Sequence, residues 1–239
     1  MDYAESLEGM FKGLEDETFS VFNNQRRAVP RTHQNSNDIR MFSKHGVDAV
    51  LYGNFDEAGK IESDILGKWE SLRSQEGPTI FGLQMCADAG KELVEFLVVR
   101  RVFPYIVGEM EEIDFQSRSW QAIMPDNIGM EDMCPVWFFG AVDAISELSR
   151  MVDRYMALHQ GALRRSERMK IRKNFLRIAE DWYNFLDYVQ KNVVPQVMDD
   201  FNKWGFKGSF RSVLPRVRYA AGHQLDLVNI AIEMMPDPS

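Results

Sequence analysis

Apolar side chains recur along this 239-residue chain at intervals of three and four positions, the spacing that places them on one face of an α-helix. No segment alternates apolar and polar residues between turn-forming residues, as a half-buried β-strand would. The pattern therefore predicts an all-α fold. Because the helical stretches are long and their connections short, we expect a helical bundle.

Glycine and proline residues mark where the helices should end. Gly53 suits a left-handed helix stop, and Pro104 cannot continue the backbone hydrogen bonds of a helix. Pro135, whose fixed φ suits a first helical turn, should open the most apolar helix. The helices expected from these positions cover about residues 39–50, 58–72, 79–103, 135–160, 171–189 and 209–235.

No linker rich in Ser, Gly or Pro divides the chain, so residues 1–239 should form a single domain. The beginning of the chain is its least regular part. Leu7 and Phe11 suggest a helix, whereas Pro30 and the neighbouring Asn and Gln residues suggest a mobile connection. We therefore expect residues 1–36 to form a mobile N-terminal segment.

Cysteine content and hydropathy bear on the compartment. The two cysteines, Cys86 and Cys134, are too few for a disulfide framework or a Cys-rich zinc site, and they suit a reducing compartment. The longest apolar runs are far shorter than the roughly 20 residues that span a bilayer, and the N-terminus lacks a basic and then apolar signal. We expect a cytoplasmic protein, or a nuclear one in a eukaryote, with no membrane association.

Charge is distributed unevenly along the chain. The net charge of −8 disfavours nonspecific attraction to nucleic acid. The segment from Arg154 to Arg177, however, holds eight basic residues and one acid, and the stretch from Lys203 to Arg218 holds basic residues and no acid. Such asymmetry suits a polyanionic partner, and it equally suits a solvated helix face that pairs with acids elsewhere.

Two pairs of carboxylates lie within otherwise apolar helices. Asp143 and Glu147 are four residues apart, and Glu92 and Glu95 are three apart on the preceding long helix, so four acids converge if these helices pack side by side. Two carboxylates about 5 Å apart repel by roughly 3 kcal/mol, so the cluster would need protons, arginines or metal ions. Oxygen ligands favour Mg²⁺ or Mn²⁺. Alternatively, Glu147 forms an ion pair with Arg150, and Glu92 and Glu95 face solvent.

Other chemistries find no support in the sequence. The four histidines are scattered, so a histidine general base is not indicated. A di-iron bundle would require Glu-x-x-His on two helices, and that motif is absent. The chain also lacks the glycine-rich phosphate loop and the dinucleotide-binding fingerprint, which argues against nucleotide-dependent enzymes.

The segments that contain these acidic residues resemble those of a known family. The segment Gly140–Met151, with its Glu-Leu-Ser-Arg core, resembles the central helix of the translin and translin-associated factor X (TRAX) family. The Glu92-x-x-Glu95 pair is similar to the other half of the acidic site of TRAX-type subunits. The similarity extends in helix order and spacing from about Asn37 to Met234.

The resemblance implies a seven-helix subunit of a hollow, usually octameric barrel with Mg²⁺-dependent ribonuclease sites inside. Translin-type subunits bind nucleic acid but lack the full acidic set, so the chain is nearer the TRAX type. The implied activity is that of an Mg²⁺-dependent endoribonuclease acting on single-stranded or short structured RNA, with Mn²⁺ as the alternative ion. The implied catalytic and metal-binding residues are Glu92, Glu95, Asp143 and Glu147. The competing hypothesis is a non-catalytic RNA- or DNA-binding scaffold subunit.

Basic residues and apolar faces suggest the partners, which are RNA or single-stranded DNA and other subunits. Arg150 and Arg154 follow Glu147 on the same stripe and should lie nearest the scissile group. Apolar residues on more than one face of 93–103 suggest an interface in a homo-oligomer, or in a hetero-oligomer with a translin-like subunit. The residues expected to contact phosphates farther along the strand are Arg164, Arg165, Arg168, Arg172 and Lys173.

Overall fold

The computed structural model describes residues 33–73, 80–109, 130–192 and 213–233, and these residues form helices and no strands. The all-α prediction is confirmed, while the helix suggested near Leu7 lies outside the described residues. In the described ranges, no helix is both long enough and apolar enough to cross a membrane. The helices are 33–51, α2 (Phe55–Arg73), α3 (Ile80–Val107), α5 (Met130–Leu158), α6 (Arg165–Asn192) and α8 (Val213–Glu233).

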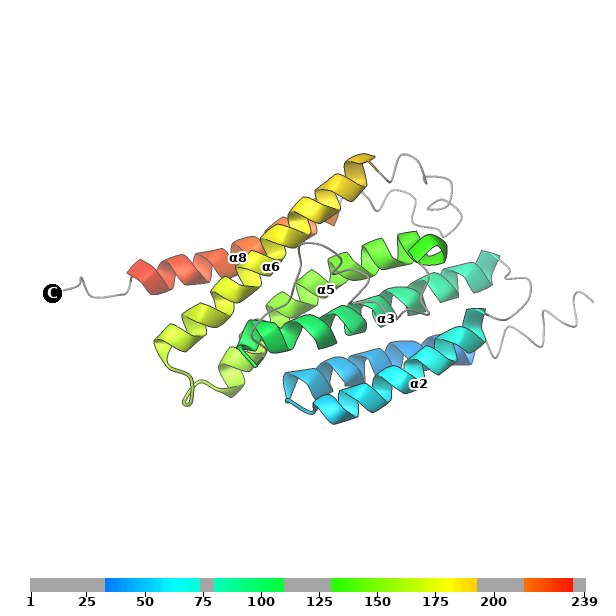
Figure 1. Ribbon diagram of the computed structural model, residues 1–239, viewed down its shortest axis with the longest axis horizontal. Coiled ribbons are helices and arrows are strands. Elements are labelled where there is room, and N and C mark those ends of the chain that lie inside the picture. Colours follow the sequence, from blue (N-terminus) through cyan, green and yellow to red (C-terminus); the bar gives the residue numbers. More distant parts are fainter. Residues whose placement is uncertain (1–32, 74–79, 110–129, 193–212, 234–239) are drawn as a thin grey trace, which may run out of the picture.

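Helix α3 lies at the centre of the bundle (Figure 1). It packs against α2, α5 and α6, and α5 in turn packs against α6 and α8. Helix 33–51 and α2 form a hairpin along one side, where residues 33–36, expected in a mobile segment, are already helical. The apolar faces of α3 that suggested a subunit interface are covered within the chain itself. Their residues Leu93, Phe96, Leu97, Val98, Val99, Val102 and Phe103 are at most 1% exposed.

The predicted stop at Gly53 is confirmed. Gly53 has a φ of 76°, and its N–H donates to the carbonyl of Val50 at 3.1 Å. The N–H of Asn54 donates to the carbonyl of Ala49 at 2.8 Å, which completes the paired hydrogen bonds of a Schellman motif. Glycine adopts this left-handed conformation without a steric penalty, so the sequence marks the turn into α2 correctly.

The predicted stop before Pro104 is wrong, because α3 continues to Val107. Gly108 ends the helix with a φ of 87°, and its N–H donates to the carbonyl of Tyr105 at 3.1 Å. The N–H of Glu109 donates to the carbonyl of Pro104 at 2.8 Å. Pro104 removes one hydrogen bond through its missing N–H, yet its carbonyl accepts a bond of the terminal motif, so the last turn is retained.

Two later helices begin earlier than predicted. Helix α5 starts at Met130, so Pro135 lies inside it, where a proline near the start of a helix removes a single backbone bond. Helix α6 starts at Arg165, ahead of its apolar stripe. The carboxylate of Glu167 accepts the backbone N–H of Arg164 at 2.7 Å, which is half of a capping box. This polar cap extends α6 beyond its apolar positions.

Gly140 sets the spacing between α3 and α5. A Cβ atom at this position would lie 2.6 Å from the Cβ of Val94 and 2.8 Å from the carbonyl oxygen of Lys91. These distances are shorter than ordinary contacts, so only glycine permits this approach. The close approach brings the carboxylates of the two helices toward one another.

Replacing Gly140 with alanine should lower the free energy of unfolding by about 1–3 kcal/mol, because the methyl group overlaps a backbone oxygen on a buried helix. Gly67→Ala in α2 is the matched control, since nothing lies within 4 Å of a Cβ there. That control should be neutral, or stabilising by up to about 1 kcal/mol, because alanine favours helix. Urea unfolding of both variants measures the difference. Equal stabilities would contradict the close contact.

Candidate functional site

Three of the four carboxylates identified from the sequence line one cavity. Glu92 and Glu95 come from α3 and Glu147 comes from α5, while helix 33–51 forms the third wall. The cavity has a volume of about 420 Å³ and is partly open to solvent. We call it the acidic cavity. The convergence that the spacing predicted therefore holds for these three residues.

The fourth carboxylate, that of Asp143, does not line the acidic cavity. Its carboxylate accepts a hydrogen bond from Arg216 of α8 at 2.8 Å, and its other oxygen lies 3.4 Å from the Nζ of Lys91. Asp143 is not among the residues that line the acidic cavity, although its charge reaches Glu95. The fourth predicted acid thus joins α5 to α3 and α8 in the described arrangement.

Glu95 is the most perturbed titratable group of the cavity. Burial raises its pKa to about 8, and the charges of Glu92, Glu147 and Asp143 contribute in the same direction. Arg150 opposes the shift but does not cancel it. Glu95 is consequently protonated at neutral pH, because a second buried negative charge is unfavourable beside its neighbours.

Glu62 shows how this chain stabilises a buried carboxylate for structure alone. It is 7% exposed and forms ion pairs with both Arg100 and Arg101, the second at 2.8 Å. Within the part of the chain that the structure describes, Glu95 has no such cationic partner. A buried acid without a cation is unfavourable for stability, and such perturbed groups are concentrated at functional sites.

The carboxylate oxygens of the acidic cavity are ligands of the kind that hard metal ions prefer. Among the described residues, no three His, Cys, Asp or Glu side chains are already placed around one metal position, and Glu147 is paired with Arg150. The cavity nonetheless presents carboxylate oxygens, the ligands that Mg²⁺ and Mn²⁺ prefer, and a divalent ion would neutralise their repulsion. To bind such an ion, the three carboxylates would have to move closer together and Glu147 would have to leave Arg150.

Cationic side chains share the acidic cavity. Arg150 and Arg154 of α5 line it together with Glu147. The guanidinium of Arg150 is largely exposed and paired with Glu147, and that of Arg154 lies 3.0 Å from the carboxylate of Asp48. Lys44, on helix 33–51, also lines the cavity. The cationic side chains therefore lie beside the carboxylates, where they would attract an anionic substrate into the cavity.

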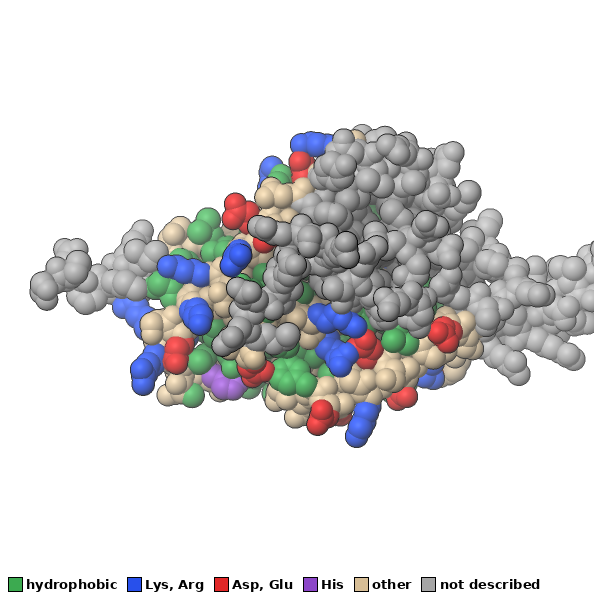
Figure 2. All heavy atoms as spheres, viewed as in Figure 1, with side chains coloured by type: hydrophobic (Ala, Val, Ile, Leu, Met, Phe, Trp, Pro, Cys, Tyr) green, Lys and Arg blue, Asp and Glu red, His purple; other side chains and the backbone are tan. Residues whose placement is uncertain are grey.

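The basic run after α5 divides into exposed and internal residues. Arg164, Arg165 and Lys173 are exposed, and Arg168 is half-buried. Arg172 points inward, with its side chain only 16% exposed. On the face shown in Figure 2, Lys and Arg side chains are scattered among acidic and apolar ones. The predicted phosphate contacts other than Arg172 remain on the surface.

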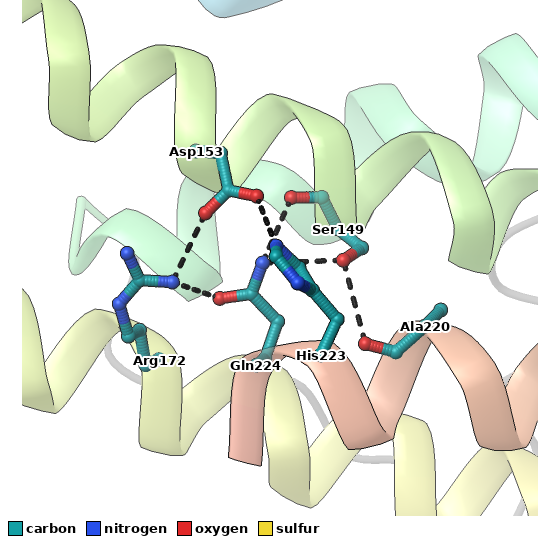
Figure 3. A network of polar contacts seen from close by, with 6 residues as sticks. All are labelled: Ser149, Asp153, Arg172, Ala220, His223 and Gln224. Atoms are coloured by element: carbon teal, nitrogen blue, oxygen red, sulfur yellow. Dashed lines mark hydrogen bonds and ion pairs between the residues drawn. The ribbon is translucent and has the colours of Figure 1, made fainter. Parts of the chain in front are cut away.

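Arg172 belongs to a polar network that joins α5, α6 and α8 (Figure 3). Its guanidinium donates to Asp153 at 3.0 Å and also to Gln224, which is fully buried. Gln224 donates in turn to the carbonyl of Ser149 at 3.1 Å. Burial alone would raise the pKa of Asp153, but hydrogen bonds from His223, Gln224 and Arg172 outweigh it and hold that pKa below its ordinary value. Arg172 therefore has a structural partner for its charge.

The contribution of helix 33–51 was missed from the sequence. Ser43, Lys44 and Asp48 line the acidic cavity, yet they are single polar positions on an amphipathic helix with no motif around them. The four-residue spacing of Lys44 and Asp48 places them on one face, but it does not say which helix they face. Which helix they face depends on contacts between segments that are far apart in the sequence.

The fold matches that of AfC3PO over nearly the whole chain. The structure of AfC3PO in complex with duplex RNA has a TM-score of 0.64 and 16% identity, and the match covers 93% of this chain and 98% of that one. The crystal structure of AfC3PO gives a TM-score of 0.64 at 17% identity, covering 91% and 96%. No protein-family model and no curated protein sequence matches the chain. The likeness establishes the fold.

Proposed function

We propose that this chain is a translin-like RNA-binding subunit that cleaves single-stranded or short structured RNA as an Mg²⁺-dependent endoribonuclease. The observation that carries the proposal is the acidic cavity, where Glu92, Glu95 and Glu147 lie beside Arg150 and Arg154. The shared fold with AfC3PO, whose structure includes a complex with duplex RNA, supports RNA as the ligand. The presence of all four acids supports a TRAX-type subunit.

The residues of the cavity take distinct roles in this proposal. Glu92, Glu95 and Glu147 would hold Mg²⁺ or Mn²⁺, and Asp143, one turn before Glu147, would be the fourth acid. The bound ion would activate water and polarise the phosphodiester. Glu95 would hold the ion in its deprotonated form, because ligating carboxylates are deprotonated. Arg150, separated from Glu147, stabilises negative charge that develops on the phosphate.

Oligomerisation is part of the proposal, either as a hollow homo-oligomer or with a translin-like subunit. Apolar side chains remain exposed on α8, where Tyr219 is 82% and Leu225 is 47% exposed. Leu225 also lines an apolar groove of about 470 Å³ between α6 and α8.

Light scattering should give a mass that is a multiple of 27.7 kDa for the chain alone. A monomer, even at high concentration, would contradict the homo-oligomer.

Cleavage of RNA tests the proposed activity directly. A labelled oligoribonucleotide should be cleaved internally by the wild-type chain in Mg²⁺ or Mn²⁺. A chelator should abolish the cleavage, and added Mg²⁺ should restore it, because the ion supplies the activated water. RNA binding without cleavage under all these conditions would instead favour the non-catalytic scaffold subunit. Cleavage that persists in the chelator would contradict the metal-dependent mechanism.

A further inference from the structure

The third wall of the acidic cavity carries a buried hydroxyl with no hydrogen-bond partner. Ser43 on helix 33–51 lines the cavity and is 2% exposed. Within the described residues its Oγ makes no hydrogen bond. A serine inside a helix commonly bonds to the carbonyl one turn earlier, and buried polar groups are nearly always paired. The Ser43 hydroxyl therefore lacks the partner that a buried polar group normally has, and a ligand in the cavity would supply one.

The neighbouring residue supplies an uncommitted positive charge. Lys44 lines the same cavity, and it makes no ion pair within the part of the chain that the structure describes. The two arginines of the cavity differ in this respect, because Arg150 is paired with Glu147 and Arg154 with Asp48. Lys44 is thus the cation of this cavity whose charge no described carboxylate neutralises.

The charges around the cavity indicate which ligand would complete it. When all are ionised, the lining holds four carboxylates and three cations, so a bound divalent ion would leave a net charge of +1. A phosphodiester carries a single negative charge. Lysine ammonium and serine hydroxyl groups are common donors to backbone phosphates, which they position without reading sequence. The lining residues with charge are Lys44, Asp48, Glu92, Glu95, Glu147, Arg150 and Arg154.

We propose that Ser43 and Lys44 form a phosphate-binding pair that holds one backbone phosphate of the RNA strand against helix 33–51. The Lys44 ammonium supplies charge, and the Ser43 hydroxyl donates a hydrogen bond that fixes the orientation of the phosphate. The inference rests on the proposed function, since it takes RNA as the ligand. It assigns helix 33–51 a direct role in substrate binding.

RNA affinity of single variants tests the pair. Binding of a labelled single-stranded oligoribonucleotide is measured by fluorescence anisotropy across salt concentrations in Ca²⁺, which takes the same oxygen ligands as Mg²⁺. Lys44→Ala should weaken binding about fivefold or more and reduce the salt slope by about one unit. Lys60→Ala is the control, because Lys60 is exposed on α2 and does not line the cavity. It should bind RNA like the wild-type chain.

Ser43→Ala separates a binding role from a structural one. The variant has no hydrogen bond to lose within the described residues, so its thermal stability should equal or exceed that of the wild-type chain. Its RNA affinity should nevertheless fall about threefold, because the phosphate loses one hydrogen-bond donor. Unchanged RNA affinity in Ser43→Ala, or equal affinities of Lys44→Ala and Lys60→Ala, would overturn the inference.

Single-turnover cleavage in Mg²⁺ distinguishes this inference from the proposed function. If the wild-type chain binds RNA with the expected losses in both variants but cleaves nothing, the phosphate-binding pair stands and the catalytic proposal fails. If the wild-type chain cleaves RNA and both variants bind and cleave like Lys60→Ala, the pair is wrong and the catalytic proposal stands. If the wild-type chain binds no RNA, both are wrong.

Discussion

Glu95→Gln should stabilise the folded chain at alkaline pH and flatten the dependence of its stability on pH. Burial and the neighbouring acids raise the pKa of Glu95 from 4.5 to about 8, so between these values the folded chain holds a proton that the unfolded chain has released. The stability contributed by this group is therefore fully present below the unfolded pKa and is lost as the pH rises toward the folded one. Glutamine keeps a neutral side chain throughout and avoids this loss.

The expected size of the effect follows from the shift. The full shift corresponds to roughly 5 kcal/mol, and partial solvent access to the carboxylate reduces the expectation to about 2–4 kcal/mol. Urea unfolding should show a difference between Glu95→Gln and wild type that grows from near zero at about pH 5 to this value at about pH 9. Glu180→Gln, an exposed position on α6, should show no such growth. A difference that stays constant across this range would contradict the burial of an unpaired acid.

The sequence predicted the helices better than their ends. Periodicity of 3.6 residues identified the helical regions, because each helix buries one or more apolar faces against the others. The position of Pro104 misled the prediction, since the motif built around Gly108 retains the last turn of α3. Helix ends depend on individual capping hydrogen bonds, and a local pattern indicates only some of these.

Convergence of the acids was predictable because it depends on spacing within two helices. Glu92 and Glu95 share a face of α3, and Glu147 lies on the side of α5 that meets it, where Gly140 permits close packing. The pairing of Asp143 with Arg216 was not predictable, because it depends on the register of α8 against α5.

The inward direction of Arg172 has a similar origin. It depends on where α6 brings that residue against Asp153 and Gln224, which lie on two other helices. A count of basic residues along the sequence cannot separate an arginine in such a network from an exposed one, such as Arg164. The run of basic residues therefore predicted only some of the exposed cationic side chains correctly.

Loss of RNA cleavage in Glu147→Gln tests the central claim most directly. The substitution keeps the size of the side chain but removes the charge that would hold the metal ion, and it releases Arg150 from its ion pair. The expected loss in the single-turnover rate is about a hundredfold or more, equivalent to roughly 3 kcal/mol of transition-state stabilisation.

The matched variant is Glu180→Gln, which makes the same chemical change on the exposed surface of α6, outside the acidic cavity. Both variants are compared with the wild-type chain in saturating Mg²⁺, with urea unfolding to verify that each is folded. The account predicts that Glu180→Gln cleaves RNA at the wild-type rate while Glu147→Gln is about a hundredfold slower or inactive. Equal cleavage rates for the two folded variants would contradict the assignment of the acidic cavity as the catalytic centre.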